Sequence, residues 1–79
     1  MDVTLRAREV IAAVLNVEMA AVERGSSADT IAGWDSLRHV QLVLALEESF
    51  GIQFDVEDIE SMSTVGAVVD AVQRRLAKE

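Results

Sequence analysis

The stretch GWDSLRHVQLVLALEESFGI, residues 33–52, predicts one long helix together with its start and its end. From Ser36 to Phe50 the apolar residues recur at helical spacing. Asp35 directly precedes this run, where a short acceptor side chain caps a helix, and Gly51 follows it, where a left-handed residue ends one. We therefore predict a helix that Asp35 caps and that begins at a serine.

The predicted helix has two apolar faces when its residues are spaced by roughly 100°. The face expected to meet the core carries His39, Leu42, Val43, Leu46 and Phe50. The second face, about 130° away by the same construction, carries Leu37, Val40 and Leu44 and is bordered by Gln41, Glu47 and Glu48. Because acids are costly to bury unpaired, we expect this second face to be exposed and to dock a partner that has an apolar groove and a basic rim. The alternative is a central helix that is buried on both sides.

The rest of the chain predicts three further helical segments and one long loop. A first helix over 4–16 begins near Asp2 or Thr4, and a last helix follows Thr64. The acidic segment DVEDIESM, residues 55–62, predicts one or two helical turns. The expected fold is all-α, a four-helix bundle with a long first loop and a short third helix. We expect the long loop to be anchored by Val17, Val22, Ile31 and Trp34.

Size, composition and charge limit the functions open to this chain. Its 79 residues leave little room for an enclosed active site, and without cysteine it has no thiol of its own. The net charge is -7, of which residues 35–60 carry -6, and an acidic surface repels nucleic acid and anionic lipid but attracts basic protein surfaces. The alternative is that the acids only keep the surface soluble. The opening residues show helical spacing rather than the pattern of a signal peptide. No stretch reaches the roughly 20 apolar residues that span a bilayer. We therefore expect a cytoplasmic protein.

The segment GWDSLRHVQLVLALEESFGI resembles the region of acyl carrier proteins around the serine that receives phosphopantetheine, whose core is Asp-Ser-Leu. Here that core is Asp35, Ser36 and Leu37, and the likeness extends from LRAREVIAAVL to STVGAVVDAVQRRL. The resemblance implies a single carrier domain over 1–79 in which Ser36 carries a 4′-phosphopantetheine arm, with acyl groups held as thioesters on the terminal thiol. The lack of cysteine fits, because the cofactor brings the thiol.

The resemblance also implies partners. A phosphopantetheinyl transferase binds the second helix, supplies metal and base, and directs the Ser36 hydroxyl onto coenzyme A. Acyl-loading and acyl-processing enzymes of fatty acid, polyketide or a related dedicated pathway then dock through basic surfaces. We expect a freestanding monomer, since the helices begin and end close to the ends of the chain. Partner recognition falls on Leu37, Arg38, Val40, Leu44, Glu47, Glu48, Asp55, Glu57 and Asp58, with Glu60 beside them.

The residues themselves agree with attachment at Ser36. A serine at a helix N-terminus is accessible, and it lies where backbone N–H groups and the positive end of the helix dipole favour a phosphate. If Asp35 caps the helix, Ser36 is left free for modification. Without the resemblance, Asp35 and Ser36 would be interpreted as an ordinary cap.

Three residues of this segment need separate interpretation. Arg38 stands where many family members have an acid, and its positive charge opposes the helix dipole and a basic partner, so we expect it to select a different transferase or synthase. Trp34 stands where a small residue is common. A Trp here resembles variants seen in carriers dedicated to pathways outside bulk fatty acid synthesis. We expect Trp34 to pack over the loop and the bundle end. His39 lies on the core face, where we expect a partly buried neutral ring near the path of an acyl chain that folds back between the helices.

Three other functions compete with that of an acyl carrier. Ser36 and His39 lie three residues apart, as a nucleophile and its base would on a helix. A helix start faces solvent, however, and no oxyanion-forming loop is recognisable, so we expect no catalysis. A peptidyl or aminoacyl carrier is the nearer alternative, although the acid before Ser36 favours acyl cargo. The third is an unmodified helical interaction module, which would tolerate Ser36→Ala.

Overall fold

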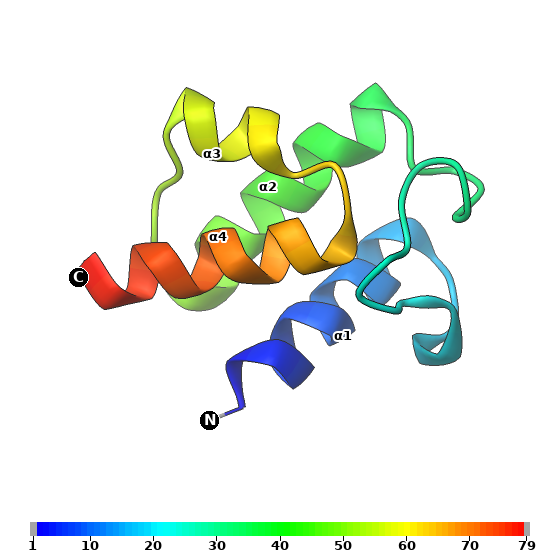
Figure 1. The fold of residues 1–79 in the computed structure, drawn as a ribbon, viewed down its shortest axis with the longest axis horizontal. Coiled ribbons are helices and arrows are strands. Elements are labelled where there is room, and N and C mark those ends of the chain that lie inside the picture. Colours follow the sequence, from blue (N-terminus) through cyan, green and yellow to red (C-terminus); the bar gives the residue numbers. More distant parts are fainter. Residues whose placement is uncertain (1, 79) are drawn as a thin grey trace.

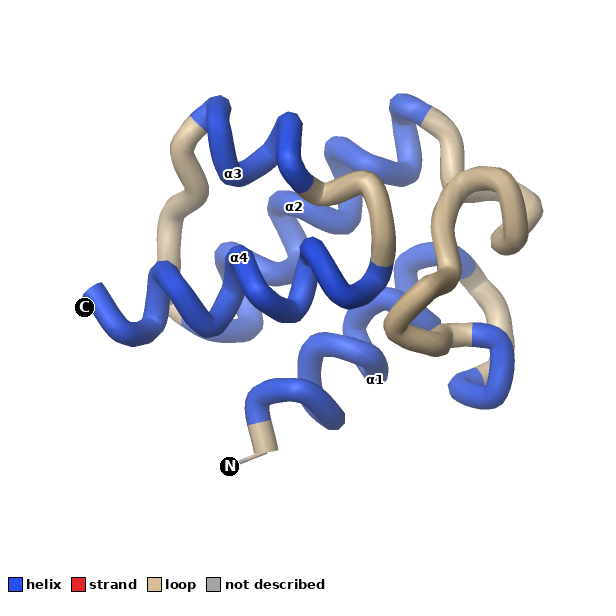
Figure 2. Tube along the Cα trace, viewed as in Figure 1, coloured by secondary structure: helices blue, strands red, loops and turns tan. Residues whose placement is uncertain are grey.

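The computed structural model describes residues 2–78 and contains four α-helices and one 3₁₀ turn (Figures 1 and 2). Within these residues the only β-type pairing is an isolated bridge between Ser27 and Thr64. The predicted all-α, four-helix architecture, with its long first loop and short third helix, is confirmed. The elements are α1 (Val3–Leu15), η1 (Met19–Ala21), α2 (Ser36–Phe50), α3 (Val56–Ser61) and α4 (Val65–Lys78).

The long helices α1, α2 and α4 pack against one another, and the short α3 packs against α4 at one edge (Figure 1). The loop between α1 and α2 gathers at the end of the bundle where α1 ends and where α2 and α4 begin (Figure 1). The start of α2 therefore lies beside the loop, at the same end of the molecule.

Short polar side chains and left-handed residues set the helix ends, as the sequence predicts. The Asp2 carboxylate accepts a hydrogen bond from the Leu5 N–H at 3.1 Å. Asp2 rather than Thr4 therefore caps α1, which starts one residue earlier than predicted. Asn16 at φ 56° and Gly51 at φ 66° adopt the left-handed conformation that ends α1 and α2.

The core fills the space between α1, α2 and α4. Burying one valine, leucine or isoleucine side chain contributes about 1.5–3 kcal/mol to the free energy of unfolding, relative to leaving it exposed. The predicted core face of α2 is confirmed, with Phe50 half-buried at its end, and α4 contributes a buried apolar stripe that ends at the half-buried Leu76. The largest fully buried side chains are Ile11, Val22, Leu42, Leu46, Val65, Val68 and Val72.

The first part of the long loop is fixed by apolar anchors and by an arginine of α1. Arg8 donates from Nε to the Val22 carbonyl at 2.8 Å and from Nη2 to the Met19 carbonyl at 3.2 Å. These two bonds hold the loop against the helix that precedes it. The predicted anchors Val22, Ile31 and Trp34 are buried, and Val17 is half-buried.

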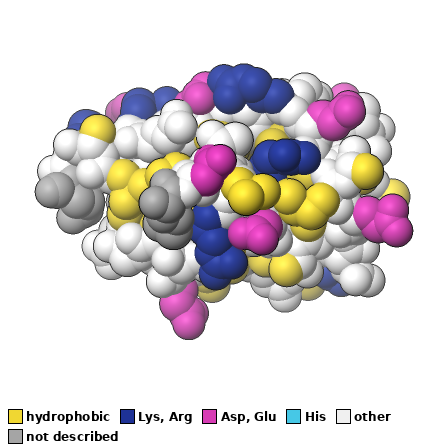
Figure 3. Space-filling model, turned by 90° about the horizontal axis from the view of Figure 1, so that it is seen from below, with side chains coloured by type: hydrophobic (Ala, Val, Ile, Leu, Met, Phe, Trp, Pro, Cys, Tyr) yellow, Lys and Arg dark blue, Asp and Glu magenta, His cyan; other side chains and the backbone are white. Residues whose placement is uncertain are grey.

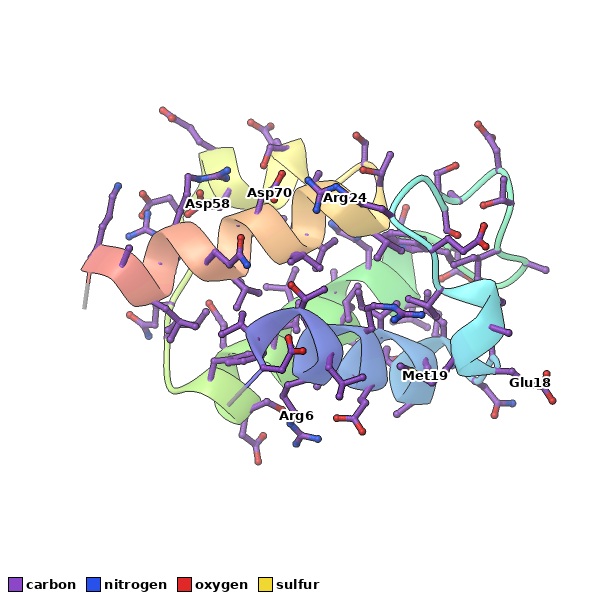
Figure 4. The ribbon with its side chains drawn as sticks, turned by 60° about the horizontal axis from the view of Figure 1, so that its bottom comes forward. Arg6, Glu18, Met19, Arg24, Asp58 and Asp70 are labelled. Atoms are coloured by element: carbon purple, nitrogen blue, oxygen red, sulfur yellow. The ribbon has the colours of Figure 1, made fainter. Side chains whose placement is uncertain are left out.

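The middle of the loop is tied to the start of α4. Ser26 is buried, and its carbonyl accepts from the Val65 N–H at 2.9 Å. The Arg24 carbonyl accepts from the Gly66 N–H at 2.8 Å, and the Arg24 side chain pairs with Asp70 of α4 at 2.9 Å (Figure 4). A loop of this length therefore has a defined path up to the start of α2.

The surface of the described residues has no membrane-spanning helix and carries charges of both signs on the face shown in Figure 3. No helix within residues 2–78 is both long enough and apolar enough to cross a membrane. On the face shown in Figure 3, acidic and basic side chains are interspersed around hydrophobic ones. That face does not present a single sign of charge.

Candidate functional site

Asp35 caps helix α2 and leaves the neighbouring serine outside the cap. The Asp35 carboxylate accepts from the Arg38 N–H at 2.8 Å, and the Asp35 carbonyl accepts from the His39 N–H, also at 2.8 Å. Ser36 is the first residue of the helix and its side chain is exposed. Its hydroxyl therefore lies at the positive end of a 15-residue helix, a position that favours an attached phosphate.

A solvent-open groove of about 580 Å³ lies beside Ser36. Three segments form it: the end of the long loop, the first turn of α2 and the connection from α3 to α4. A flexible group attached to the Ser36 oxygen has this groove as its nearest concave surface. The lining residues are Ala28, Trp34, Asp35, Ser36, His39, Val40, Met62 and Ser63.

Trp34 and His39 form a hydrogen-bonded pair of stacked rings in this groove. Trp34 Nε1 lies 3.1 Å from His39 Nδ1, and the two ring planes are inclined by 20° with centroids 6.2 Å apart. An indole N–H only donates, so Nδ1 must offer its lone pair. His39 Nε2 lies 3.4 Å from the Ile59 carbonyl, which only accepts, so Nε2 carries the proton.

The hydrogen bond between His39 and Trp34 determines whether the imidazole can act as a base. The ring is half-buried, and its Nδ1 lone pair is engaged by Trp34. The sequence-based expectation of a partly buried histidine is confirmed. A ring held in this way is not available as a base for Ser36.

Arg38 is directed toward α1, which the sequence did not predict. Its side chain is half-buried, and Nη1 donates to the Val14 carbonyl at 2.6 Å. Val14 lies in the last turn of α1, where helix carbonyls have no partner within the helix. Arg38 therefore joins the end of α1 to the start of α2. We expected it to act in partner selection, but this contact gives it a structural role in the described chain.

The second apolar face of α2 is exposed. The exposed fractions are 65% for Leu37, 56% for Val40 and 59% for Leu44, whereas Leu42 of the core face is at 0%. The prediction that this face is not buried is confirmed, and the alternative of a helix buried on both sides is wrong. We call Leu37, Val40 and Leu44 the outer strip.

Asp58 does not lie on the surface, contrary to our expectation. Its carboxylate is buried between α3 and α4, where Arg75 Nε donates at 2.8 Å and Arg74 Nη2 lies at 3.3 Å (Figure 4). The hydrogen bond from Arg75, helped by the Asp55 backbone N–H, lowers the pKa of Asp58. The same contact raises the pKa of Arg75. Asp58 therefore joins α3 to α4 and is not part of a docking surface.

The other predicted acids divide into two groups. Glu47 is half-buried and accepts from the Phe54 N–H at 2.9 Å, which fixes the chain as it leaves α2. Asp55 is exposed but pairs with Arg75. Glu47 and Asp55 thus contribute to the fold as well as to the surface charge. Of the acids predicted for partner recognition, Glu48, Glu57 and Glu60 are exposed and form no ion pair within residues 2–78.

Two comparisons with known proteins bear on this site. Residues 6–72 match the family described as "Phosphopantetheine attachment site", so the chain belongs to this family of carrier domains. The structure is similar to the solution structure of a holo acyl carrier protein from Geobacter metallireducens. The TM-score is 0.86 and the sequence identity 28%, and the match covers 99% of this chain and 90% of that chain.

Together these findings place the chain in the acyl carrier protein family, whose members hold a covalently attached phosphopantetheine and are carriers, not catalysts. The residues present fit that group. The structure offers an exposed serine at a helix N-terminus, a separate cap and an adjoining groove. The family's need for modifying and acyl-processing enzymes also gives a reason for exposed apolar residues on α2.

Proposed function

We propose that Ser36 carries the phosphopantetheine and that residues 1–79 act as a single carrier domain around it. The strongest support comes from the different roles of two neighbouring residues at the start of α2: Asp35 caps the helix, and Ser36 stays exposed. Modification of the Ser36 oxygen leaves the cap intact. The negative phosphodiester is stabilised by the helix dipole and by N–H groups of the first turn.

The chemistry of loading is shared between this chain and its transferase. The Ser36 hydroxyl attacks the phosphorus on the pantetheine side of the pyrophosphate of coenzyme A and loses its proton to a base of the transferase. A phosphodiester forms as the P–O–P bond breaks, and adenosine 3′,5′-bisphosphate leaves with its charge stabilised by the transferase's metal. When bound, the phosphopantetheine supplies a thiol that holds acyl groups as thioesters. Ser36 is the acceptor, Asp35 holds the helix start in place, and His39 takes no proton.

The outer strip is the proposed docking surface for the transferase and for acyl-loading and acyl-processing enzymes. It begins directly beside Ser36 and follows α2 for two turns. An exposed apolar strip with acids around it fits a partner that has an apolar groove and basic residues at the rim. The acids proposed for that contact are Glu48, Glu57 and Glu60.

We infer that the cargo is an acyl group of a fatty acid, polyketide or related dedicated pathway, carried by a cytoplasmic monomer. The acid before Ser36 and the likeness to an acyl carrier support acyl cargo over peptidyl or aminoacyl cargo. An unmodified interaction module is the alternative from another class.

Attachment is tested by intact-protein mass after incubation with coenzyme A, magnesium and a broad-specificity phosphopantetheinyl transferase. The parent should gain one phosphopantetheine and Ser36→Ala none. Ser49→Ala is the matched control, since Ser49 is an exposed serine near the other end of α2. A folded parent that gains no mass with several transferases would contradict the proposal and favour the interaction module.

The docking surface is tested by Val40→Glu, with Leu5→Glu on α1 as the control, because both side chains are largely exposed. Both variants should stay folded. Losing the burial of one valine in the complex should slow loading of Val40→Glu by about tenfold, since such burial is worth about 1.5 kcal/mol. Loading of Leu5→Glu should stay near the parent rate, and added salt should slow loading of the parent. Equal loading rates for both variants would sink the docking proposal.

A further inference from the structure

We propose that Trp34 and His39 form a closed floor of the groove beside Ser36, so that an acyl group carried there stays on the surface instead of entering the bundle. This proposal rests on the proposed attachment at Ser36. It assigns the cargo to short acyl groups, because a long apolar chain finds no interior space to occupy. Trp34 and His39 are thereby specificity-determining residues.

The two rings separate the groove from the core. Trp34 lines the groove, yet it is only 7% exposed and belongs to the core cluster. Its ring is hydrogen-bonded to that of His39 and nearly parallel to it, and His39 lines the same groove. Trp34 thus borders both the groove and the apolar core.

Polar contacts lock the floor across three segments. Trp34 belongs to the loop, His39 to α2 and Ile59 to α3, and the hydrogen bonds run from the first to the third through the imidazole. Opening the floor would break the hydrogen bonds that join these segments, which is unfavourable. Neutral His39 suits this position because it accepts at one nitrogen and donates at the other.

The space behind the floor is already filled. Leu42 and Leu46 are at 0% exposure, and neither of them lines the groove. An acyl chain would have to displace these packed side chains in order to enter, and close-packed interiors resist this. On its other side, α3 is held to α4 by the ion pair of Asp58 with Arg75. The short helix is therefore fixed on both of its flanks.

The test compares how fast hydroxylamine cleaves butyryl and octanoyl thioesters on the loaded protein, measured by intact mass. An unprotected thioester reacts at a rate that does not depend on chain length. On the parent the two rates should agree within about twofold, because neither chain is buried. An octanoyl thioester cleaved on the parent more than about fivefold slower than butyryl, equivalent to about 1 kcal/mol of burial, would overturn the proposal.

Two variants sharpen this result. Trp34→Ala removes the floor, and on it octanoyl should be cleaved at least about fivefold slower than butyryl as the longer chain enters. Trp34→Phe keeps an aromatic ring but not its N–H, and should give a smaller difference. If Trp34→Ala folds and still cleaves both thioesters equally fast, the floor is not what excludes the chain. If it does not fold, the parent and Trp34→Phe decide.

The floor is also tested without any cofactor. Nitrogen NMR of the unmodified protein should show His39 Nδ1 unprotonated and Nε2 protonated. The opposite tautomer would overturn the floor while leaving attachment at Ser36 untouched. Failure of the transferase to load the protein, together with the expected tautomer, would instead contradict the proposed function.

Discussion

The two faces of α2 have similar apolar residues and different surroundings. Leu42 and Leu46 are fully buried against α1 and α4, whereas Leu44, between them in sequence, is 59% exposed. Apolar character alone therefore does not reveal what a residue does. One face holds the fold together, and the other is exposed and is the surface that we propose for partners that meet Ser36. Substituting neighbouring residues, one buried or engaged in the fold and one exposed, tests whether they have these different roles.

The largest effect is expected from the two leucines. Leu42→Ala should lower the free energy of unfolding by about 2–5 kcal/mol, because it removes buried methyl groups and leaves a cavity. Leu44→Ala, the same chemical change on the outer strip, should change it by less than about 0.5 kcal/mol. Urea denaturation followed by circular dichroism measures both values. Equal losses for the two variants would mean that the faces are not distinct.

The next pair consists of two acids of α3. Asp58→Asn should lower the free energy of unfolding by about 1.5 kcal/mol, since it weakens hydrogen bonds with charged arginines. Glu57→Gln should have an effect below about 0.5 kcal/mol, because Glu57 is exposed. Urea denaturation at neutral pH provides the comparison. A larger loss for Glu57→Gln than for Asp58→Asn would reverse the assignment of the two acids.

The Asp58 contact also predicts a dependence on pH. Because folding lowers the pKa of Asp58 below its ordinary value of 3.8, the contact stabilises the protein fully at pH values above 3.8. This stabilisation is lost as the pH falls through the lower value of the folded state. The stability difference between the parent and Asp58→Asn should therefore shrink in acid. A difference that stays constant down to acid unfolding would contradict the prediction.

The smallest expected effect separates the cap from the attachment site. Asp35→Ala should lower the free energy of unfolding by about 1 kcal/mol, the usual cost of a lost N-cap. Ser36→Ala should leave stability nearly unchanged, because Asp35 supplies the cap. Thermal and urea denaturation of the two unmodified variants test this pair. A cap-sized loss for Ser36→Ala would show that the serine is needed for the fold.

Local patterns predicted much of this molecule. The bounds of α2, its cap at Asp35 and its end at Gly51 follow from short-range sequence signals. The exposure of the outer strip follows from helical periodicity and from the cost of burying acids. The burial of Trp34 follows from the tendency of an aromatic side chain to cover apolar surface. These features depend on residues close together in the chain, so the sequence contains the information directly.

Long-range polar contacts were not predictable in the same way. Arg8, Arg38 and Asp58 each bind a segment far away in the chain, and their sequence neighbours do not specify the partner. A charged residue on a short exposed helix is usually solvated. Because of this general expectation, Asp58 was wrongly predicted to lie on the docking surface. The acceptor role of His39 Nδ1 was also missed, because it depends on where the loop brings Trp34.

The core face of α2 builds the fold, and we propose that the outer strip presents Ser36 to partners. The most direct measurement is a titration of the unmodified protein, with leucine and valine methyl groups labelled, with a phosphopantetheinyl transferase in the absence of coenzyme A. We predict that the methyl signals of Leu37, Val40 and Leu44 broaden or shift first. The methyl signals of Leu5, which is exposed on α1, should stay unchanged. Perturbation of Leu5 with an unchanged outer strip would contradict the proposal.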